Sequence, residues 1–207
     1  MLFIKRLFSL ALLLISTQVY ADIQAGRDYK EVSPAQAAHS GEKIEVLEFF
    51  FYGCSHCFHL HPKLSAWEKK MPKDVELVLV PTIFRDSWEP MARTYYALEA
   101  IGQLQRMHDE LFAAWNINNI DLGDEARILD FLGPRGVDRA KFSAAYNSFS
   151  MGSKISRSNQ MVRDFGIRGT PTVIVDGKYA VTGLSPDETI RVLNELIVKA
   201  RKERSKR

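Results

Sequence analysis

The segment Phe49-Phe50-Phe51-Tyr52-Gly53-Cys54-Ser55-His56-Cys57 joins an apolar run to the only two cysteines of the chain. Residues 44–51 are rich in apolar and aromatic side chains, which is typical of a buried strand. A helix is predicted to begin near Cys54 and to end at about Lys70, before Pro72. This order places one thiol at the start of a helix and the other one turn inside it.

The spacing of the two cysteines predicts a redox centre. A disulfide needs Cα atoms about 5–6 Å apart, and positions i and i+3 in a first helical turn meet that requirement. Cys54 would lie among unpaired backbone N–H groups at the positive end of the helix dipole, and both stabilise a thiolate. His56 would add to this effect if it is protonated or donates a hydrogen bond. We expect an exposed Cys54 that is attacked first and a buried Cys57.

The rest of the chain predicts a sheet with helices inserted in its middle. Residues 75–80 read as a second strand, and a strand, helix, strand order at this spacing indicates a parallel crossover. Residues 88–165 have a helical texture, with Ser87, Asp124 and Asp138 as candidate N-caps and a last helix expected over 153–165.

The C-terminal region returns to strand signals. Residues 172–175 and 179–182 flank Asp176-Gly177-Lys178, which is a hairpin signature. Ser185 followed by Pro186 and two acidic residues is a typical helix start. The chain therefore ends in a hairpin and a helix.

Residues 1–21 have the features of a cleaved secretory signal. Lys5 and Arg6 form a basic region, residues 7–15 form an apolar run, and small or moderate side chains precede a cut after Ala21. A membrane anchor is the alternative, but the run is under half of the ~20 residues that a span needs. We expect an exported protein, most simply in the bacterial periplasm.

Two cysteines in an exported protein usually form a structural disulfide. Closing so short a loop would remove only ~2 kcal/mol of chain entropy, against ~4.7 kcal/mol for a loop of about 100 residues. A chain of this length can bury a sufficient core without such a bridge. The pair is better explained by chemistry than by stability.

The formal net charge of +3 depends on the basic tail, residues 199–207. The tail is expected to be a solvated, frayed helix end, and contact with anionic lipid is the alternative. The charge therefore gives no reason to expect a nucleic-acid partner.

The chain resembles the DsbA-type thiol:disulfide oxidoreductases. The resemblance rests on residues 47–50, on Cys54 to Cys57, on Trp88 through Tyr95-Tyr96, and on Gly169-Thr170-Pro171-Thr172 with the hairpin turn. It implies an α/β protein with a thioredoxin fold and an inserted all-helical domain. Residues 22–86 and 167–207 would form the thioredoxin-like domain, and residues 87–166 the inserted helical domain.

The resemblance also implies a function. By this resemblance, the protein would be a periplasmic enzyme that donates its Cys54–Cys57 disulfide to folding exported proteins. A DsbB-type quinone-linked membrane protein would then reoxidise the cysteine pair. Pro171 would be cis in a loop that faces the disulfide, and the backbone of Thr170 would pair with an extended substrate chain. No cofactor is expected on this chain, and a monomer is expected.

Two positions depart from the family pattern. Ser55 stands where a proline often lies between the cysteines, beside the expected substrate site, so the redox potential is open. Glu48 matches a buried acid of the family, but Leu79 stands where a lysine often accompanies it. Burial would raise the pKa of Glu48, which could then relay protons to Cys57. The alternative is a solvated carboxylate at a strand end.

A zinc site is the rival interpretation of the same segment. Cys54, His56, Cys57, His59 and His61 are all possible ligands, but on one helix they cannot surround an ion. The remaining histidines, His39 and His108, are isolated in the sequence. We therefore expect no metal, and we expect His59 and His61 to be exposed.

Two alternatives to an oxidase remain open. A periplasmic reductase or isomerase of the same fold is compatible with Thr170 before Pro171, although no dimerisation domain is apparent to support an isomerase. A chaperone-like peptide-binding module with an incidental disulfide belongs to another class. A variant without cysteines would still bind and function in that case.

Overall fold

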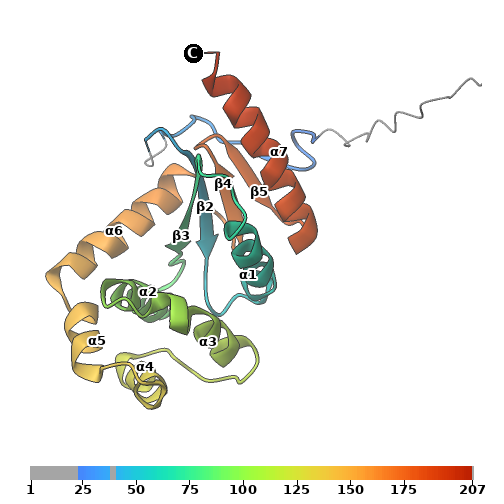
Figure 1. Cartoon of the computed structure of the whole chain (residues 1–207). Helices are drawn as coiled ribbons and strands as arrows, with labels where there is room; N and C mark the ends of the chain where they lie inside the picture. The colour runs from blue at the N-terminus through green and yellow to red at the C-terminus, as the bar shows by residue number, and fades with distance from the viewer. Residues whose placement is uncertain (1–22, 38–40, 207) are drawn as a thin grey trace, which may run out of the picture.

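The computed structural model describes residues 23–37 and 41–206, and it shows a mixed five-stranded sheet covered by helices (Figure 1). The strands are β1 (Lys30–Glu31), β2 (Ile44–Phe50), β3 (Val75–Pro81), β4 (Thr172–Val175) and β5 (Tyr179–Thr182). The helices are α1 (Ser55–Glu68), α2 (Glu89–Ala100), α3 (Leu104–Asn116), α4 (Glu125–Leu132), α5 (Arg139–Tyr146), α6 (Phe149–Asp164) and α7 (Pro186–Arg204), with short 3-10 turns at Asp86–Trp88 and Gly133–Arg135. The predicted signal and His39 lie outside the described residues.

The sheet has the order β1-β5-β4-β2-β3. Strands β2 and β3 are parallel and joined through α1, which confirms the predicted crossover. Strands β4 and β5 form the predicted hairpin, in which Asp176 and Gly177 both have positive φ, as a two-residue turn of type I′ requires. Strand β1 was not predicted, because a two-residue strand carries no readable alternation.

Side chains alternate between the two faces of the sheet, and each face has its own helices. Val46 and Val173 pack with α1 and α7 on one face, whereas Leu47 and Ile174 pack with the end of α6 on the other. Figure 1 shows this layering, with α2 to α5 gathered beyond the carboxyl ends of β2 and β3. The helices expected over residues 88–165 are therefore confirmed as a cluster at the edge of the sheet where α1 begins.

Helix α6 belongs to two cores. Its first half contributes Met151 and Ile155 to the core of the helical cluster, and its second half places Met161 against the sheet. The helix starts at Phe149 rather than at the predicted Ser153. The division of the chain into 22–86 with 167–207, and 87–166, stays a prediction.

Local capping signals explain most helix starts. Asp124 and Asp138 accept hydrogen bonds from the backbone N–H groups of Arg127 and Lys141, as predicted. Ser185 forms a capping box with Glu188 at the start of α7. The prediction for Ser87 was wrong, since it lies inside a 3-10 turn and α2 begins after Trp88. Pro90 in the first turn of α2 favours this later start, because a missing N–H costs nothing there.

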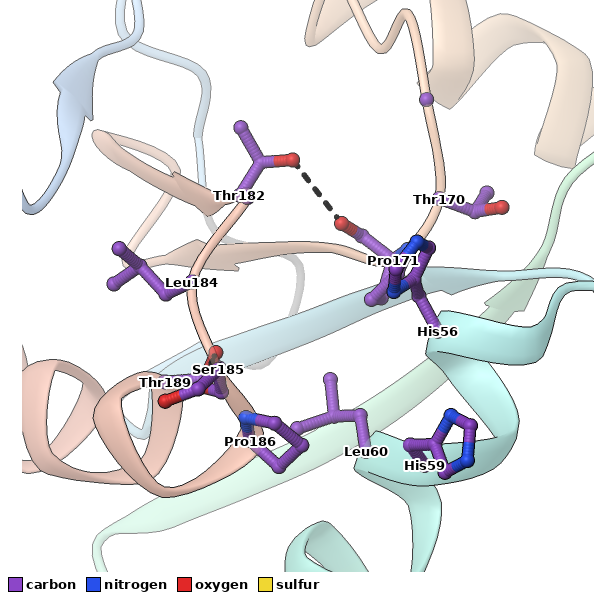
Figure 2. Close-up of a pocket in the computed structure, with 12 residues that line it drawn as sticks. His56, His59, Leu60, Thr170, Pro171, Thr182, Leu184, Ser185, Pro186 and Thr189 are labelled. Atoms are coloured by element: carbon purple, nitrogen blue, oxygen red, sulfur yellow. Dashed lines mark hydrogen bonds between the residues drawn. The ribbon is translucent and has the colours of Figure 1, made fainter.

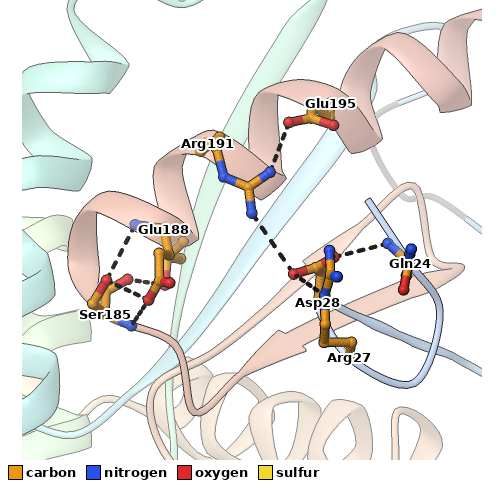
Figure 3. Close-up of polar contacts among 8 residues, drawn as sticks. Gln24, Arg27, Asp28, Ser185, Glu188, Arg191 and Glu195 are labelled. Atoms are coloured by element: carbon orange, nitrogen blue, oxygen red, sulfur yellow. Dashed lines mark hydrogen bonds and ion pairs between the residues drawn. The ribbon is translucent and has the colours of Figure 1, made fainter. Parts of the chain in front are cut away.

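An ionic network ties the N-terminal segment to α7 (Figure 3). The buried Asp28 accepts a hydrogen bond from the Gln24 backbone at 2.8 Å and lies 2.7 Å from the guanidinium of Arg27. Arg191 on α7 approaches the same carboxylate at 3.7 Å and pairs with Glu195 at 2.9 Å. The segment that follows the predicted signal is thereby fixed against the body of the protein.

The prediction of a frayed basic tail was wrong for the described residues. Helix α7 continues to Arg204, whose guanidinium pairs with the buried Asp176 in the hairpin turn. Lys178 donates to Asp176 at 2.8 Å, and Arg201 pairs with Asp74 at 2.7 Å. The Asp176 carboxylate needs cationic partners because an uncompensated buried charge is costly, and Arg204 of the tail is one of these partners. No helix within the described residues has the length and apolar content to cross a membrane.

We predict that Gly177→Ala destabilises the protein more than Gly183→Ala. Both glycines have positive φ, which costs an L-residue about 1–2 kcal/mol. A Cβ at Gly177 would also collide with the Gln36 carbonyl oxygen, whereas the space around Gly183 is open. Urea unfolding of both variants measures the difference. Equal losses of stability in the two variants would show that the collision with the Gln36 carbonyl oxygen does not affect the free energy of unfolding.

Candidate active site

Cys54 is the N-cap residue of α1. Its backbone is extended, and its Sγ accepts a hydrogen bond from the Cys57 backbone N–H at 3.5 Å. The Cys54 N–H donates to the Phe51 carbonyl at 3.0 Å, which closes the turn after β2. The predicted helix start is confirmed, and the sulfur lies where the first backbone N–H groups of the helix are unpaired.

Aromatic side chains form the floor under this turn. The Phe51 ring stacks on Trp88 with centroids 3.8 Å apart and meets Trp115 edge-on at 5.5 Å. A Cβ at Gly53 would lie 2.5 Å from the Phe51 ring and 2.7 Å from the Trp115 nitrogen. Only glycine fits at this position, because the chain turns directly against the two rings before it presents Cys54.

The two sulfurs have opposite environments. Cys54 is half-buried, whereas Cys57 is fully buried one turn inside α1, and both are free thiols in this structure. Burial raises the pKa of Cys57 far above its usual range, and the hydrogen bond to Cys54 and the nearby Glu48 raise it further. Cys57 is therefore a thiol in the reduced protein, and its predicted burial is confirmed.

The pKa of Cys54 is lowered to about 5. The largest cause is the hydrogen bond from the Cys57 thiol, and Thr170 and the backbone N–H groups of Cys57 and His56 act in the same direction. Partial burial of Cys54 opposes them. The predicted thiolate is thus supported by the helix N-terminus, but its main stabilising partner is the second cysteine.

The loop before β4 faces the cysteine pair. The Thr170–Pro171 peptide bond is cis, and the Cys54 thiol lies 3.3 Å from the Thr170 carbonyl oxygen. Both features were expected from the family resemblance. The loop and the start of α1 are 116 residues apart in sequence, and the pairing of β4 with β2 brings them together.

A pocket of about 400 Å³ opens beside Cys54 (Figure 2). His56, His59 and Leu60 of α1 line one side, and Thr170 with Pro171 lines another. The turn between β5 and α7 completes it with Thr182, Gly183, Leu184, Ser185, Pro186 and Thr189. The apolar members give the pocket a surface that suits a peptide side chain, with backbone polar groups close to the reactive sulfur.

Ser55 and His56 are both exposed at the start of α1. His56 contributes its backbone N–H to the Cys54 sulfur, and its side chain lines the pocket. Both residues between the cysteines are therefore accessible from solvent next to the reactive sulfur.

Glu48 lies beneath the cysteines on β2 and is almost completely buried. Its pKa is raised to about 8, first by burial and then by the charge on Cys54. Leu79 on β3 is the register partner of Glu48, and it is the residue that the family resemblance placed at the lysine position. No lysine therefore stands opposite Glu48 on β3. The Glu48 Oε1 has no hydrogen-bond partner among the described residues. The alternative of a solvated carboxylate at a strand end was wrong.

His61 was predicted to be exposed like His59, and this was wrong. Its ring is packed between α1 and α3, 4.9 Å from the Phe112 ring and 4.6 Å from the ring of His108. His108 is itself buried and bonded to the Tyr52 hydroxyl at 2.6 Å, so it is not isolated in space. The sequence could not show this, because the exposed face of α1 depends on where α3 lies.

The described residues contain no group of three or more His, Cys, Asp or Glu side chains that could hold a metal ion. His61 pairs with Asp109, and His59 lies in the pocket beside Pro171. The five candidate ligands of the sequence are therefore dispersed around α1 rather than directed to one point.

A DSBA-like thioredoxin domain matches residues 45–193, which is most of the chain. The chain belongs to the DsbA family. The thiol:disulfide interchange protein DsbA of Burkholderia cepacia is 36% identical over 178 residues, covering 84% of this chain and 84% of that protein. DsbA of Pseudomonas aeruginosa is 33% identical over 183 residues, covering 87% of each.

Solved DsbA structures have the same fold. The crystal structure of Pseudomonas aeruginosa DsbA matches with a TM-score of 0.85 and 32% identity, covering 88% of this chain and 97% of that one. NmDsbA1 from N. meningitidis matches with a TM-score of 0.82 and 29% identity, covering 89% and 97%. The predicted thioredoxin-superfamily fold is confirmed, and this DsbA-family protein is a thiol:disulfide oxidoreductase with Cys54 and Cys57 as its redox-active pair.

We predict that Cys57→Ala raises the pKa of Cys54 from about 5 toward its usual range, because the main hydrogen-bond donor is lost. Cys57→Ser retains a donor and should cause a smaller rise. The ultraviolet absorbance of the thiolate, followed against pH, gives both values. An unchanged pKa in the alanine variant would mean that the helix N-terminus alone stabilises the thiolate.

We predict that the oxidised protein loses stability as pH rises above about 4.5, because burial alone still holds the pKa of Glu48 above its usual value, and that Glu48→Gln removes this loss. Between its unfolded and folded pKa values, Glu48 retains its proton when folded and has lost it when unfolded. The folded state then binds the extra proton, so stability falls by up to about 1.4 kcal/mol per pH unit. Urea unfolding at several pH values tests this, and parallel curves for the two proteins would refute it.

Proposed function

We propose that the protein is a periplasmic oxidase that donates its Cys54–Cys57 disulfide to reduced exported polypeptides. The observation that carries the proposal is the low pKa of Cys54, held by the hydrogen bond from Cys57. A stable Cys54 thiolate favours the reduced form, and the oxidised form is then a correspondingly stronger oxidant. The likeness to curated thiol:disulfide interchange proteins supports the same reaction class.

The chemistry has two exchange steps. A substrate thiolate attacks the Cys54 sulfur, the bond to Cys57 breaks, and Cys57 leaves with the electron pair. A second substrate thiolate then attacks the substrate sulfur of the mixed disulfide and expels Cys54 as a thiolate. The substrate has lost two electrons and gained a disulfide, and the two electrons remain on Cys54 and Cys57. The low pKa of Cys54 makes it a good leaving group in the second step.

Glu48 acts as the proton donor in the first step. Cys57 leaves as a thiolate in a buried site where its neutral form is strongly favoured. Burial is the larger cause of the raised pKa of Glu48 and does not depend on the charge of Cys54, so Glu48 holds its proton in the oxidised protein as well and lies in the same buried region. It passes that proton to Cys57 and becomes a carboxylate, which has to regain a proton before the next cycle.

The pocket beside Cys54 receives the substrate chain. An extended segment would pair with the backbone at Thr170 as an added strand, next to the cis Pro171. Its side chains would contact Leu60, Leu184 and Pro186. His56 lines the same pocket and Ser55 is exposed next to it, so both would contact the residues that flank the substrate cysteine.

A membrane partner of the DsbB type, linked to a quinone, would restore the disulfide. The predicted signal at residues 1–21 supports export to the periplasm, where unfolded exported proteins are the available thiols. A monomer suffices, because both cysteines, Glu48 and the pocket belong to one chain. No nucleic-acid partner is proposed.

The redox equilibrium of the cysteine pair with glutathione tests the oxidase. We expect a potential well above the cytosolic poise of about −220 to −320 mV, a reduced form that melts at a higher temperature than the oxidised form, and no dithiol oxidation by Cys54→Ser. A potential near the cytosolic poise would point to the reductase instead. Normal oxidation by Cys54→Ser, or full function without either cysteine, would refute the enzymatic proposal.

A further inference from the structure

A second cavity, of about 600 Å³, lies on the opposite side of α1 from the peptide pocket. Residues of α1, β2, β3, α2 and α3 line it, and it is distinct from the groove beside Pro171. Its lining includes Glu48 at one end and His61 with Asp109 at the other. The cavity therefore reaches from the buried acid of the active site to polar residues near the surface.

Glu48 is the deepest ionisable group of this cavity. It is 2% exposed, and its Oε1 is buried with no hydrogen-bond partner among the described residues. The side chains of β3 that line the cavity beside it, Leu77 and Leu79, carry no charge. If Glu48 gives its proton to Cys57, no cation from β3 neutralises the carboxylate that remains. Glu48 therefore needs a route by which a proton can return to it.

His61 and Asp109 occupy the outer part of the same cavity. The His61 Nε2 lies 2.5 Å from the Asp109 Oδ1, although the two residues come from α1 and α3. The His61 side chain is 13% exposed, and that of Asp109 is 84% exposed. The pair thus spans the distance between the cavity and bulk solvent, with the imidazole inside and the carboxylate outside.

Neighbouring rings hold the His61 imidazole in place. Phe112 stacks on it, and His108 meets it edge-on. Burial lowers the pKa of His108 to about 3, so His108 stays neutral, and its Nδ1 is hydrogen-bonded to the Tyr52 hydroxyl instead of carrying protons. The other ionisable groups that line the cavity are Glu68 at the end of α1, Lys69 directly after it, and Tyr95 of α2.

We propose that Glu48 regains its proton through this cavity, and that His61, oriented by Asp109, is the residue that passes the proton in from solvent. The cavity has the volume and the polar lining to admit water. His61 takes a proton from solvent as an imidazolium and releases it through water to the Glu48 carboxylate, returning to neutral imidazole. The inference rests on the proposed role of Glu48 and assigns His61 as a positioning and proton-exchange residue.

The test measures proton exchange at Glu48 directly, by nuclear magnetic resonance of the reduced protein labelled with ¹³C in its glutamate carboxyls. Glu48→Gln identifies the resonance. At the titration midpoint, fast exchange gives the wild type one averaged line. In His61→Gln, which can still bond Asp109 but cannot carry a proton, we expect exchange to slow by at least about tenfold, because positioned acid–base groups contribute ~10²-fold or more. The line then broadens or splits.

Two further measurements separate proton exchange from packing. Added imidazole should restore fast exchange in His61→Ala, where it can occupy the vacated space. Lys63→Gln is the matched control, since it breaks an exposed α1 ion pair with Asp187 on another face of the helix and should leave the line unchanged. Fast exchange in both His61 variants, or slow exchange that imidazole does not restore, overturns the inference. Neither outcome alters the redox equilibrium that tests the oxidase.

Discussion

The hydrogen bond from the buried Cys57 thiol to the Cys54 sulfur is the interaction on which the active site depends. It exists because α1 begins at Cys54, so that one sulfur caps the helix and the other lies a turn inside. Burial keeps Cys57 protonated, and its proton stabilises the charge on Cys54. Each sulfur therefore sets the protonation of the other, and the sheet, the aromatic floor and the cis Pro171 loop maintain the geometry in which they do so.

The sequence predicted those parts of the protein that local chemistry determines. The positive-φ turn at Asp176-Gly177, the N-caps Asp124 and Asp138, and the cysteines at a helix start each depend on a few adjacent residues. Strand β1 and the partners of the basic tail depend on residues far along the chain, and no local pattern encodes them. The same limit applies to His61, because a histidine on a helix reads as exposed until the packing of α3 is known.

The replacement of lysine by Leu79 changes the problem that Glu48 poses. A buried carboxyl with a paired cation could remain ionised, whereas this one is kept neutral by desolvation. In the proposed mechanism, a neutral Glu48 can donate a proton to Cys57, but each cycle then depends on the return of a proton to Glu48. The cavity on the far side of α1 lies where such a path is needed, and its lining includes Leu79, the residue that stands where a lysine often lies in the family.

The opposite pKa shifts of Cys54 and Glu48 also have a thermodynamic consequence for the reduced protein. Between about pH 5 and pH 8, folding releases a proton from Cys54, whose pKa is lowered, and takes one up at Glu48, whose pKa is raised. The two linkages have opposite signs and similar slopes, so they cancel in the balance of protons bound on folding. As far as these two groups are concerned, the stability of the reduced state is thereby buffered against changes in external pH.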